Sequence, residues 1–322
     1  MYRACDDPRL LDSLRYNCGS LIMGALEDEE VIEIMLNPDG SLWIERYGQD
    51  HERIGDISPA QGRLILSLTA SGLDITVNDR QPIVEGEFPL GGSRFEGTFP
   101  PIVGPGPSFS LRKKASKVFT LAEYLAAGSI TAQVIEIIHD AVLRRLNVVV
   151  VGGTSSGKTT FVNAVIHAIS ELTPSHRLLI LEDTAELQSK SKNTVFFRTS
   201  VLANVDMRAL AKVSMRYAPK RIIVGEVRDA AALELLKMWN TGHPGGIGTF
   251  HADSAAEALP RLEELIEEAG LGSKHKLIGR AVDLVVYMEK TPENQRRISS
   301  IIKVNGFSPL KEDYERQMLY AV

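Results

Sequence analysis

The sequence is poor in the features that mark several specialised classes of protein. Only two cysteines occur in 322 residues, Cys5 and Cys18, with no CxxC pair between them, which indicates free thiols in a reducing compartment. No apolar run approaches the about 20 residues that span a bilayer. The N-terminus carries early acids and lacks the apolar segment of a signal peptide. We therefore expect a cytoplasmic protein that reaches a membrane only through partners.

Basic charge and aromatic side chains are also scarce. The net charge is −5 and aromatic residues make up 6% of the chain. Residues 1–117 hold 12 Lys and Arg against 18 Asp and Glu, whereas the remainder holds 24 against 23. An acidic first part repels phosphate backbones, and few aromatics leave few platforms on which bases stack. We expect no direct, sequence-specific binding of nucleic acid.

The first third of the chain has the pattern of a small α+β domain. Residues 8–36 are predicted to be helical, and a turn at 37–40 precedes a strand with alternating Leu42 and Ile44. Residues 58–73 predict a helix with Ser58 as N-cap and Pro59 in its first turn. Three short strands are expected over 82–89, 93–99 and 108–113. Helices beside an antiparallel sheet make an α+β domain over 1–115.

A different pattern begins after Arg112. Residues 113–120, KKASKVFT, begin with a basic cluster, and we place the linker there. In the following domain, 116–322, apolar strands alternate with helices, which predicts a mostly parallel sheet covered on both faces. The expected strands are Asn147–Val151, Leu178–Glu182, Arg221–Gly225, Gly246–His251, Leu284–Met288 and Ile298–Val304.

The strongest motif is a phosphate-binding loop between the first of these strands and a helix. The sequence VVVVGGTSSGKTTF contains the complete GxxxxGKT pattern. Glycines let several backbone N–H groups face one anion, and the helix adds the positive end of its dipole. Lys158 is expected to reach the β- and γ-phosphates, and the Thr159 hydroxyl to bind Mg²⁺. The predicted nucleotide-binding residues are Gly152, Gly153, Thr154, Ser155, Ser156, Gly157, Lys158, Thr159 and Thr160.

Carboxylates follow two later strands, and a histidine follows a third. Glu182 and Asp183 end one strand, and Glu226 ends another, directly after Gly225. In an open parallel sheet the ligand crevice lies outside the carboxyl ends of the strands, so these acids should meet the phosphate loop. One acid is needed for Mg²⁺ and another for the attacking water. His251 ends a strand, where a neutral imidazole can bond a γ-phosphate or an acid.

Four segments together resemble one family. GGTSSGKTT, ILEDTAEL, RIIVGEVRDAAALELL and NTGHPGGIGTFHADSAAEALPRL occur in this order within 150–262. They are similar to the Walker A, Asp box, degenerate Walker B and His box of the secretion ATPases that power type II and type IV secretion and type IV pili. The spelling TGHPGG…TFHADSA and the short first domain resemble the VirB/Trb branch, and within it the conjugal-transfer ATPases.

The resemblance implies a RecA-like P-loop ATPase domain, a PAS-like N-terminal domain and a ring-shaped homohexamer that meets inner-membrane secretion components. It implies ATP and Mg²⁺ as ligands, with catalytic roles for Glu226, Glu182 and His251. Mg²⁺ would be held by Thr159, Glu182, Asp183 and Glu226, partly through water. Arg94 and Arg112 match the family's N-terminal arginines that reach the nucleotide. The four-cysteine metal site of some relatives cannot form with two cysteines.

Two other functions share the phosphate loop. A RecA-like motor on nucleic acid, such as a helicase or recombinase, would need basic grooves and stacking aromatics. The one basic cluster, RKKASK, is short and lies in the expected linker. A nucleotide-gated assembly protein without turnover would not need acids at the strand ends. The sequence therefore favours a Mg-dependent ATPase of a secretion machine.

Overall fold

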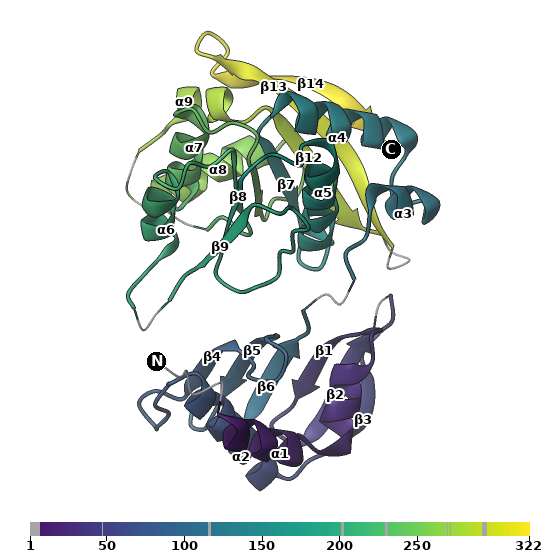
Figure 1. The fold of residues 1–322 in the computed structure, drawn as a ribbon, viewed down its shortest axis with the longest axis vertical. Helices are drawn as coiled ribbons and strands as arrows, with labels where there is room; N and C mark the ends of the chain where they lie inside the picture. The colour runs from purple at the N-terminus through teal and green to yellow at the C-terminus, as the bar shows by residue number, and fades with distance from the viewer. Residues whose placement is uncertain are drawn as a thin grey trace. The chain divides into compact units, whose positions relative to one another are not determined.

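The computed structural model describes residues 7–46, 48–114, 117–200, 203–228, 231–268, 270, 272–291 and 295–322. It consists of two compact units, Met1–Ser116 and Lys117–Val322 (Figure 1).

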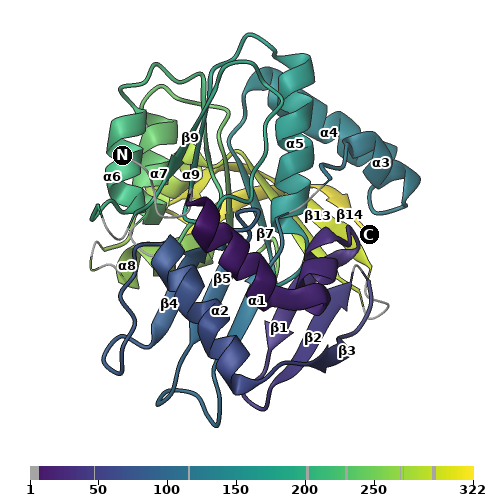
Figure 2. The same cartoon turned by 60° about the horizontal axis from the view of Figure 1, so that its bottom comes forward.

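The first unit is a six-stranded antiparallel sheet with two helices on one face (Figure 2). The strand order is β3-β2-β1-β6-β5-β4. Apolar side chains of both helices and of alternate strand positions form one core. The elements are α1 (Pro8–Glu27), β1 (Val31–Leu36), β2 (Ser41–Arg46), β3 (Glu52–Asp56), α2 (Pro59–Gly72), β4 (Ile83–Glu87), β5 (Arg94–Thr98) and β6 (Ser108–Arg112).

The expectation that residues 8–36 are all helical is wrong at its C-terminal end. Helix α1 stops at Glu27, and residues 31–36 form β1 in the centre of the sheet. The sequence VIEIML offers a buried face at Val31, Ile34 and Leu36, and pairing with β2 and β6 satisfies its backbone groups. The predicted N-cap of the next helix is confirmed, because the Ser58 side chain accepts from the Gln61 N–H.

The second unit is an eight-stranded mixed sheet in the order β14-β13-β12-β7-β11-β10-β8-β9. Strands β12, β7, β11, β10, β8 and β9 are parallel, and β13 and β14 add antiparallel ladders. The strands are β7 (Val148–Gly152), β8 (Leu178–Glu182), β9 (Thr194–Arg198), β10 (Arg221–Val224), β11 (Ile247–Phe250), β12 (Leu284–Lys290), β13 (Arg296–Ser308) and β14 (Asp313–Ala321).

Helices cover both faces of this sheet, as its apolar strands predict (Figure 1). Val148 and Val150 of β7 face one core, and Val149 and Val151 face the other. The first core packs against α3 (Leu121–Ala126), α4 (Ala132–Arg144) and α5 (Lys158–Leu172). The second packs against α6 (Met207–Ser214), α7 (Ala231–Asn240), α8 (Ala258–Glu268) and α9 (His275–Ala281).

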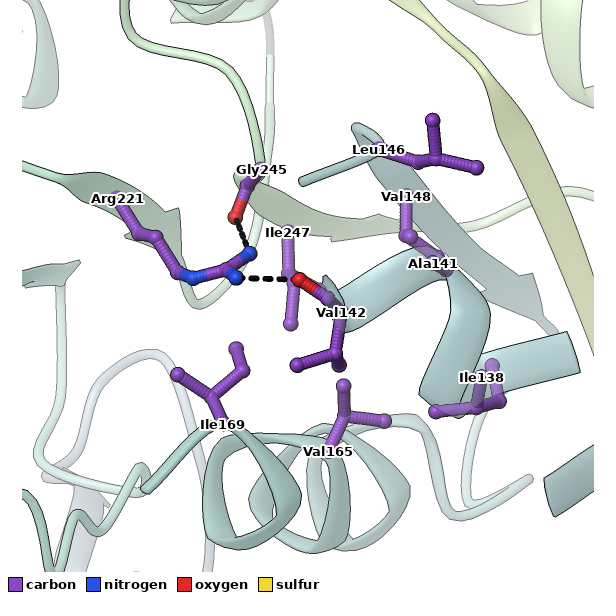
Figure 3. Close-up of a pocket in the computed structure, with 10 residues that line it drawn as sticks. All are labelled: Ile138, Ala141, Val142, Leu146, Val148, Val165, Ile169, Arg221, Gly245 and Ile247. Atoms are coloured by element: carbon purple, nitrogen blue, oxygen red, sulfur yellow. Dashed lines mark hydrogen bonds between the residues drawn. The ribbon is translucent and has the colours of Figure 1, made fainter. Parts of the chain in front are cut away.

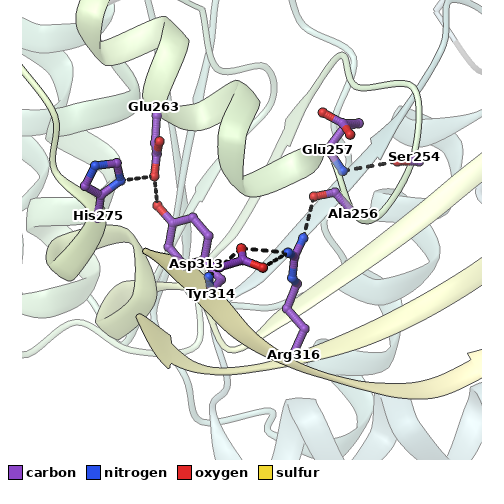
Figure 4. A network of polar contacts seen from close by, with 8 residues as sticks. All are labelled: Ser254, Ala256, Glu257, Glu263, His275, Asp313, Tyr314 and Arg316. Atoms are coloured by element: carbon purple, nitrogen blue, oxygen red, sulfur yellow. Dashed lines mark hydrogen bonds and ion pairs between the residues drawn. The ribbon is translucent and has the colours of Figure 1, made fainter. Parts of the chain in front are cut away.

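A polar network ties the C-terminal strand β14 to the helices beside it (Figure 4). The Tyr314 hydroxyl donates to the Glu263 carboxylate of α8, which also contacts the His275 ring of α9. Two residues along β14, Arg316 bonds both carboxylate oxygens of Asp313 and the Ala256 carbonyl. These contacts fix the antiparallel end of the sheet, which β12 separates from the strand that carries the phosphate loop.

Candidate functional site

The phosphate loop joins β7 to α5 at the carboxyl end of the parallel sheet. Gly152 has no room for a side chain, because a Cβ there would lie 2.1 Å from the Met288 carbonyl oxygen. Gly157, which precedes α5, has φ of 91°, and Ser155 has φ of 57°. Such left-handed positions curl the backbone so that consecutive N–H groups face one concavity. The local sequence thus builds an anion cradle at a helix N-terminus.

Lys158 turns its ammonium group back into this cradle. The side chain is buried, and its Nζ donates to the carbonyls of Gly152 at 2.8 Å and Gly153 at 2.9 Å. Gly153 and Thr154 are exposed, Ser155, Gly157, Thr159 and Thr160 are half-buried, and Ser156 is buried. The Ser156 hydroxyl has no hydrogen-bond partner among the described residues. A positive charge, exposed loop amides and an unused hydroxyl are the donors that a phosphate chain requires.

His251 stands between Lys158 and an acid. Its Nδ1 lies 3.4 Å from the Lys158 Nζ, and its Nε2 lies 3.6 Å from a Glu226 carboxylate oxygen. An ammonium group only donates, so Nδ1 accepts and the ring proton sits on Nε2, toward Glu226. Burial and the Lys158 charge lower the pKa of His251, against the opposing effect of Glu226. The imidazole is therefore neutral near pH 7.

Glu226 follows β10 and is the charged acid of the site. Arg228 donates to its second carboxylate oxygen at 2.6 Å. Burial raises the pKa of Glu226, but the hydrogen bond and charge of Arg228, with His251 and Lys158 nearby, outweigh burial and leave the pKa below its usual value. Sequence analysis did not find Arg228, although it lies only two residues beyond the acid.

Glu182, at the end of β8, differs sharply from Glu226. It is 2% exposed, and its Oε1 accepts from the backbone N–H groups of Glu186 and Leu187. Its Oε2 is buried and has no hydrogen-bond partner among the described residues. Burial raises the pKa of Glu182, although those two amides oppose the shift. A Cβ on Gly225 would lie 3.2 Å from the Glu182 Cγ, so the glycine before Glu226 makes room for this acid.

Asn163 connects the turn after Glu182 to the helix of the phosphate loop. It is 2% exposed on α5, its Nδ2 donates to the Glu186 carbonyl, and its Oδ1 accepts from the Gln188 N–H. Sequence analysis missed this residue. The available signal was a polar side chain in the apolar run FVNAVI, which a packed helix tolerates only when the side chain finds partners.

The predicted metal ligands are spread over the crevice. Asp183 is exposed and accepts from the Thr199 hydroxyl beyond the edge strand β9. Across the described ranges, no three His, Cys, Asp or Glu side chains gather into a ready-made cation site. The available groups, a threonine hydroxyl and carboxylates with one unpartnered oxygen at Glu182, are the hard oxygen ligands that Mg²⁺ takes together with phosphates and water. The donor set therefore fits that ion.

The TGHPGG part of the histidine motif lies at the other end of the sheet. It precedes β11, whereas His251 follows β11. The buried Arg221 donates to the carbonyls of Gly245 and Val142 there (Figure 3). Burial and the neighbouring Arg145 lower the pKa of Arg221 to about 10. Arg221 thus anchors this half of the motif, which forms the loop before β11 and lies away from the phosphate cradle.

Arg94 and Arg112 belong to the first unit. They lie opposite each other on β5 and β6, and alternate with the core residues Phe95 and Leu111. Both therefore point to the sheet face opposite α1 and α2. The register also sets Glu33 across from Arg112 and Glu87 across from Arg94, so cross-strand charge pairing is available to both arginines.

Comparisons with known proteins identify the family of the chain. A sequence model described as "Type II/IV secretion system protein" matches residues 58–302. A probable conjugal transfer protein TrbB of Sinorhizobium fredii is 47% identical, over 97% of this chain and 95% of the relative. TrbB of Rhizobium radiobacter is 46% identical, over 93% and 92%. The predicted family and branch are confirmed.

A solved structure confirms the fold class. The X-ray structure of the ATPase DotB of Yersinia pseudotuberculosis covers 94% of this chain and 81% of its own, with a TM-score of 0.64 and 15% identity. That likeness concerns the fold, an α/β P-loop domain with a smaller N-terminal domain. No helix in the described part of the chain is long and apolar enough to cross a membrane.

Proposed function

This chain belongs to the type II/IV secretion system protein family, and from that premise we propose that it hydrolyses ATP to power a conjugal-transfer or type IV secretion machine. The observation that carries the proposal is a series of contacts that leads from the phosphate cradle through a histidine to an acid. Lys158 is held in the cradle, His251 lies 3.4 Å from it, and Glu226 lies 3.6 Å beyond the ring. Loss of a γ-phosphate beside Lys158 would remove negative charge from the surroundings of His251 and Glu226.

Glu182 is the acid best suited to receive a proton from the attacking water. Burial raises the pKa of this carboxyl group, and a general base is most effective when its pKa lies near the working pH. Its Oε1 is fixed by two amides, which leaves the unpartnered Oε2 to orient water. Glu226, with its lowered pKa, stays ionised and serves the charge network around His251.

Mg²⁺ would be held by Thr159 and the phosphates, with Glu182, Asp183 and Glu226 reached partly through water. When bound, the ion neutralises charge on the phosphates. The chain's own contribution is to hold the phosphates with Lys158 and the loop amides and to place the acids at the adjoining strand ends.

The proposal extends to a homohexameric ring at the cytoplasmic side of the inner membrane. The relatives named as conjugal transfer proteins support attachment to a secretion machine. Direct reading of nucleic acid is not part of the proposal, because the chain carries net charge −5 and 6% aromatic residues. A RecA-like motor on nucleic acid is the competing function.

The test is hydrolysis by the wild type and by Lys158→Ala. Loss of a charge-assisted contact to the transferring group should lower kcat by at least about 10²-fold, while the variant should still fold and unfold cooperatively. Phosphate release and thermal unfolding are measured on the same samples.

Normal turnover in Lys158→Ala would end the proposal. Strong stimulation by single-stranded DNA, abolished by salt, would favour the nucleic-acid motor instead. Electron microscopy of negatively stained particles with and without ATP tests the ring, and particles of a single subunit under both conditions would contradict it.

A further inference from the structure

The hairpin formed by β12 and β13 lies along one side of the phosphate loop. β12 pairs in parallel with β7, and Met288 stands beside Gly152 at the end of that ladder. The Met288 carbonyl crowds Gly152, and the Met288 Cε would lie 3.6 Å from a Cβ on Gly157. This wall of the cradle comes from a segment that no motif of the family resemblance includes.

Arg296, the first residue of β13, makes the polar contact between this wall and the loop. Its Nε donates to the backbone carbonyl of Ser155 at 2.9 Å. Its Cδ would lie 3.1 Å from a Cβ on Gly157, so the aliphatic stem packs against the residue that precedes α5. One side chain therefore grips the loop at two points, although it is 141 residues away from Ser155 in the chain.

The loop needs such support because of its backbone. Ser155 has a φ of 57°, a left-handed conformation that residues with a Cβ adopt only at an energetic cost. A conformation of this kind persists when surrounding contacts over-determine it. The charge-assisted bond from a guanidinium to the Ser155 carbonyl is a contact of that kind.

We infer that Arg296 is a positioning residue of the phosphate loop. By holding the Ser155 carbonyl outward, it keeps the N–H groups of the loop aimed into the cradle before nucleotide arrives. Preorganisation of this kind strengthens binding of the ground state and the transition state equally, because it removes an ordering cost from both. The inference rests on the proposed nucleotide-hydrolysing function, which it deepens.

Arg297 provides a matched control on the same strand. It is half-buried like Arg296, and its Nε donates to the Glu289 carboxylate at 2.8 Å. Successive residues of a strand point to opposite faces. Removal of the Arg297 guanidinium therefore deletes one positive charge and the cross-strand ion pair with Glu289, and leaves the contact between Arg296 and Ser155 in place. Arg296→Met and Arg297→Met keep an unbranched apolar stem and delete only the donors.

The experiment measures ADP affinity, steady-state hydrolysis of ATP and backbone hydrogen exchange of residues 152–158 without nucleotide. Arg296→Met should weaken ADP and raise KM by about tenfold, the scale of one charge-assisted hydrogen bond. Its kcat should stay within about twofold, which is the signature of lost uniform binding. Loop amides should exchange faster, Arg296→Lys should recover part of the affinity, and Arg297→Met should match the wild type.

Two outcomes would overturn the inference. One is wild-type affinity and wild-type loop exchange in Arg296→Met. The other is a large fall in kcat with unchanged KM, which would mean that the guanidinium touches the reacting phosphate and is not a positioning group. If the wild type bound no nucleotide, the proposed function would fail, while loop exchange without nucleotide would still decide whether Arg296 holds the loop.

Discussion

Glu182 is a carboxylate at 2% exposure that uses one oxygen for two backbone amides and leaves the other without a partner among the described residues. Burial of an unpaired charge opposes folding, and the raised pKa of Glu182 expresses this conflict. A fold optimised for stability alone would place an apolar or neutral side chain here. The acid is therefore where stability and the proposed chemistry conflict.

Glu182→Gln should abolish turnover and stabilise the fold. An acid whose pKa is raised in the fold binds more protons there than in the unfolded chain, so stability falls as pH rises past the ordinary value of 4.5. Glutamine does not ionise, and its oxygen still accepts the two amides. The thermal midpoint of the variant should exceed the wild type by a few degrees at about pH 8 and match it at about pH 4.

Glu226→Gln is the matched comparison, because its acid has a lowered pKa and a salt bridge to Arg228. That variant should gain no stability at high pH. A Glu182→Gln protein that unfolds at the same temperature as the wild type at both pH values would show that the buried carboxylate carries no electrostatic cost.

The sequence alone proposes those candidate site residues that belong to contiguous motifs. Gly152, Lys158 and His251 are of this kind, because the loop, the helix start and the strand end that hold them follow recognisable sequence patterns. Asn163 and Arg296 were not predicted, since their roles depend on contacts with segments 23 or more residues away. A single amino-acid sequence does not show which distant residues are in contact.

At the scale of elements, the turn 183–188 and helix α5 form one unit through Asn163. The asparagine bonds the Glu186 carbonyl and the Gln188 N–H, and the same turn supplies the amides that hold Glu182. The position of Glu182 relative to the phosphate loop thus depends on the buried side-chain amide of Asn163.

Asn163→Ala should cost about 1–3 kcal/mol of unfolding free energy, because it removes two hydrogen bonds from a buried side chain to backbone groups of the turn. It should also lower kcat more than it changes KM, since Glu182 loses its fixed position while the cradle stays intact. Urea unfolding and steady-state kinetics measure both effects. Ser170→Ala on the same helix, whose hydroxyl donates to the His167 carbonyl of that helix, serves as control, and equal losses in the two variants would contradict the coupling.

The hydrophobic pattern predicted strands correctly where their side chains are fully buried. It missed strands whose side chains are only partly buried. The fully buried strands β7, β8 and β10 were predicted from their apolar runs. β9 and β14, the edge strands of the sheet, are only partly buried and were not predicted. The helix expected to continue to residue 36 ended early, since sheet pairing of β1 outweighed the local preference.

At the scale of the whole molecule, we propose that Arg94 and Arg112 act on a nucleotide, either in their own subunit or in a neighbouring one. They share one row of the first unit's sheet with Glu33 and Glu87. In a closed ring every interface is heterologous, so an arginine can act in its own subunit or in the neighbour. The glutamates also make a purely structural pairing available to them.

Arg94→Ala and Arg112→Ala should each lower turnover, by up to the 10³–10⁵-fold that arginine fingers contribute. Each variant is then mixed with Lys158→Ala subunits, and phosphate release is followed. Recovery of activity in the mixture would place the arginine across an interface. Lost turnover without recovery would place it within one chain, and normal turnover in both pure variants would show that neither arginine takes part in hydrolysis.

The Met288 carbonyl also restricts which residues the phosphate loop can carry at position 152. Every substitution at Gly152 adds a Cβ, and a Cβ there would meet that oxygen at 2.1 Å. Gly153, one residue later, meets nothing within 4 Å and is not constrained by the chain in this way. Among descendants that keep this pair of strands, drift can erase the second glycine but not the first. Retention of the first glycine of the motif is thus required by β12, a strand that lies far downstream in the sequence.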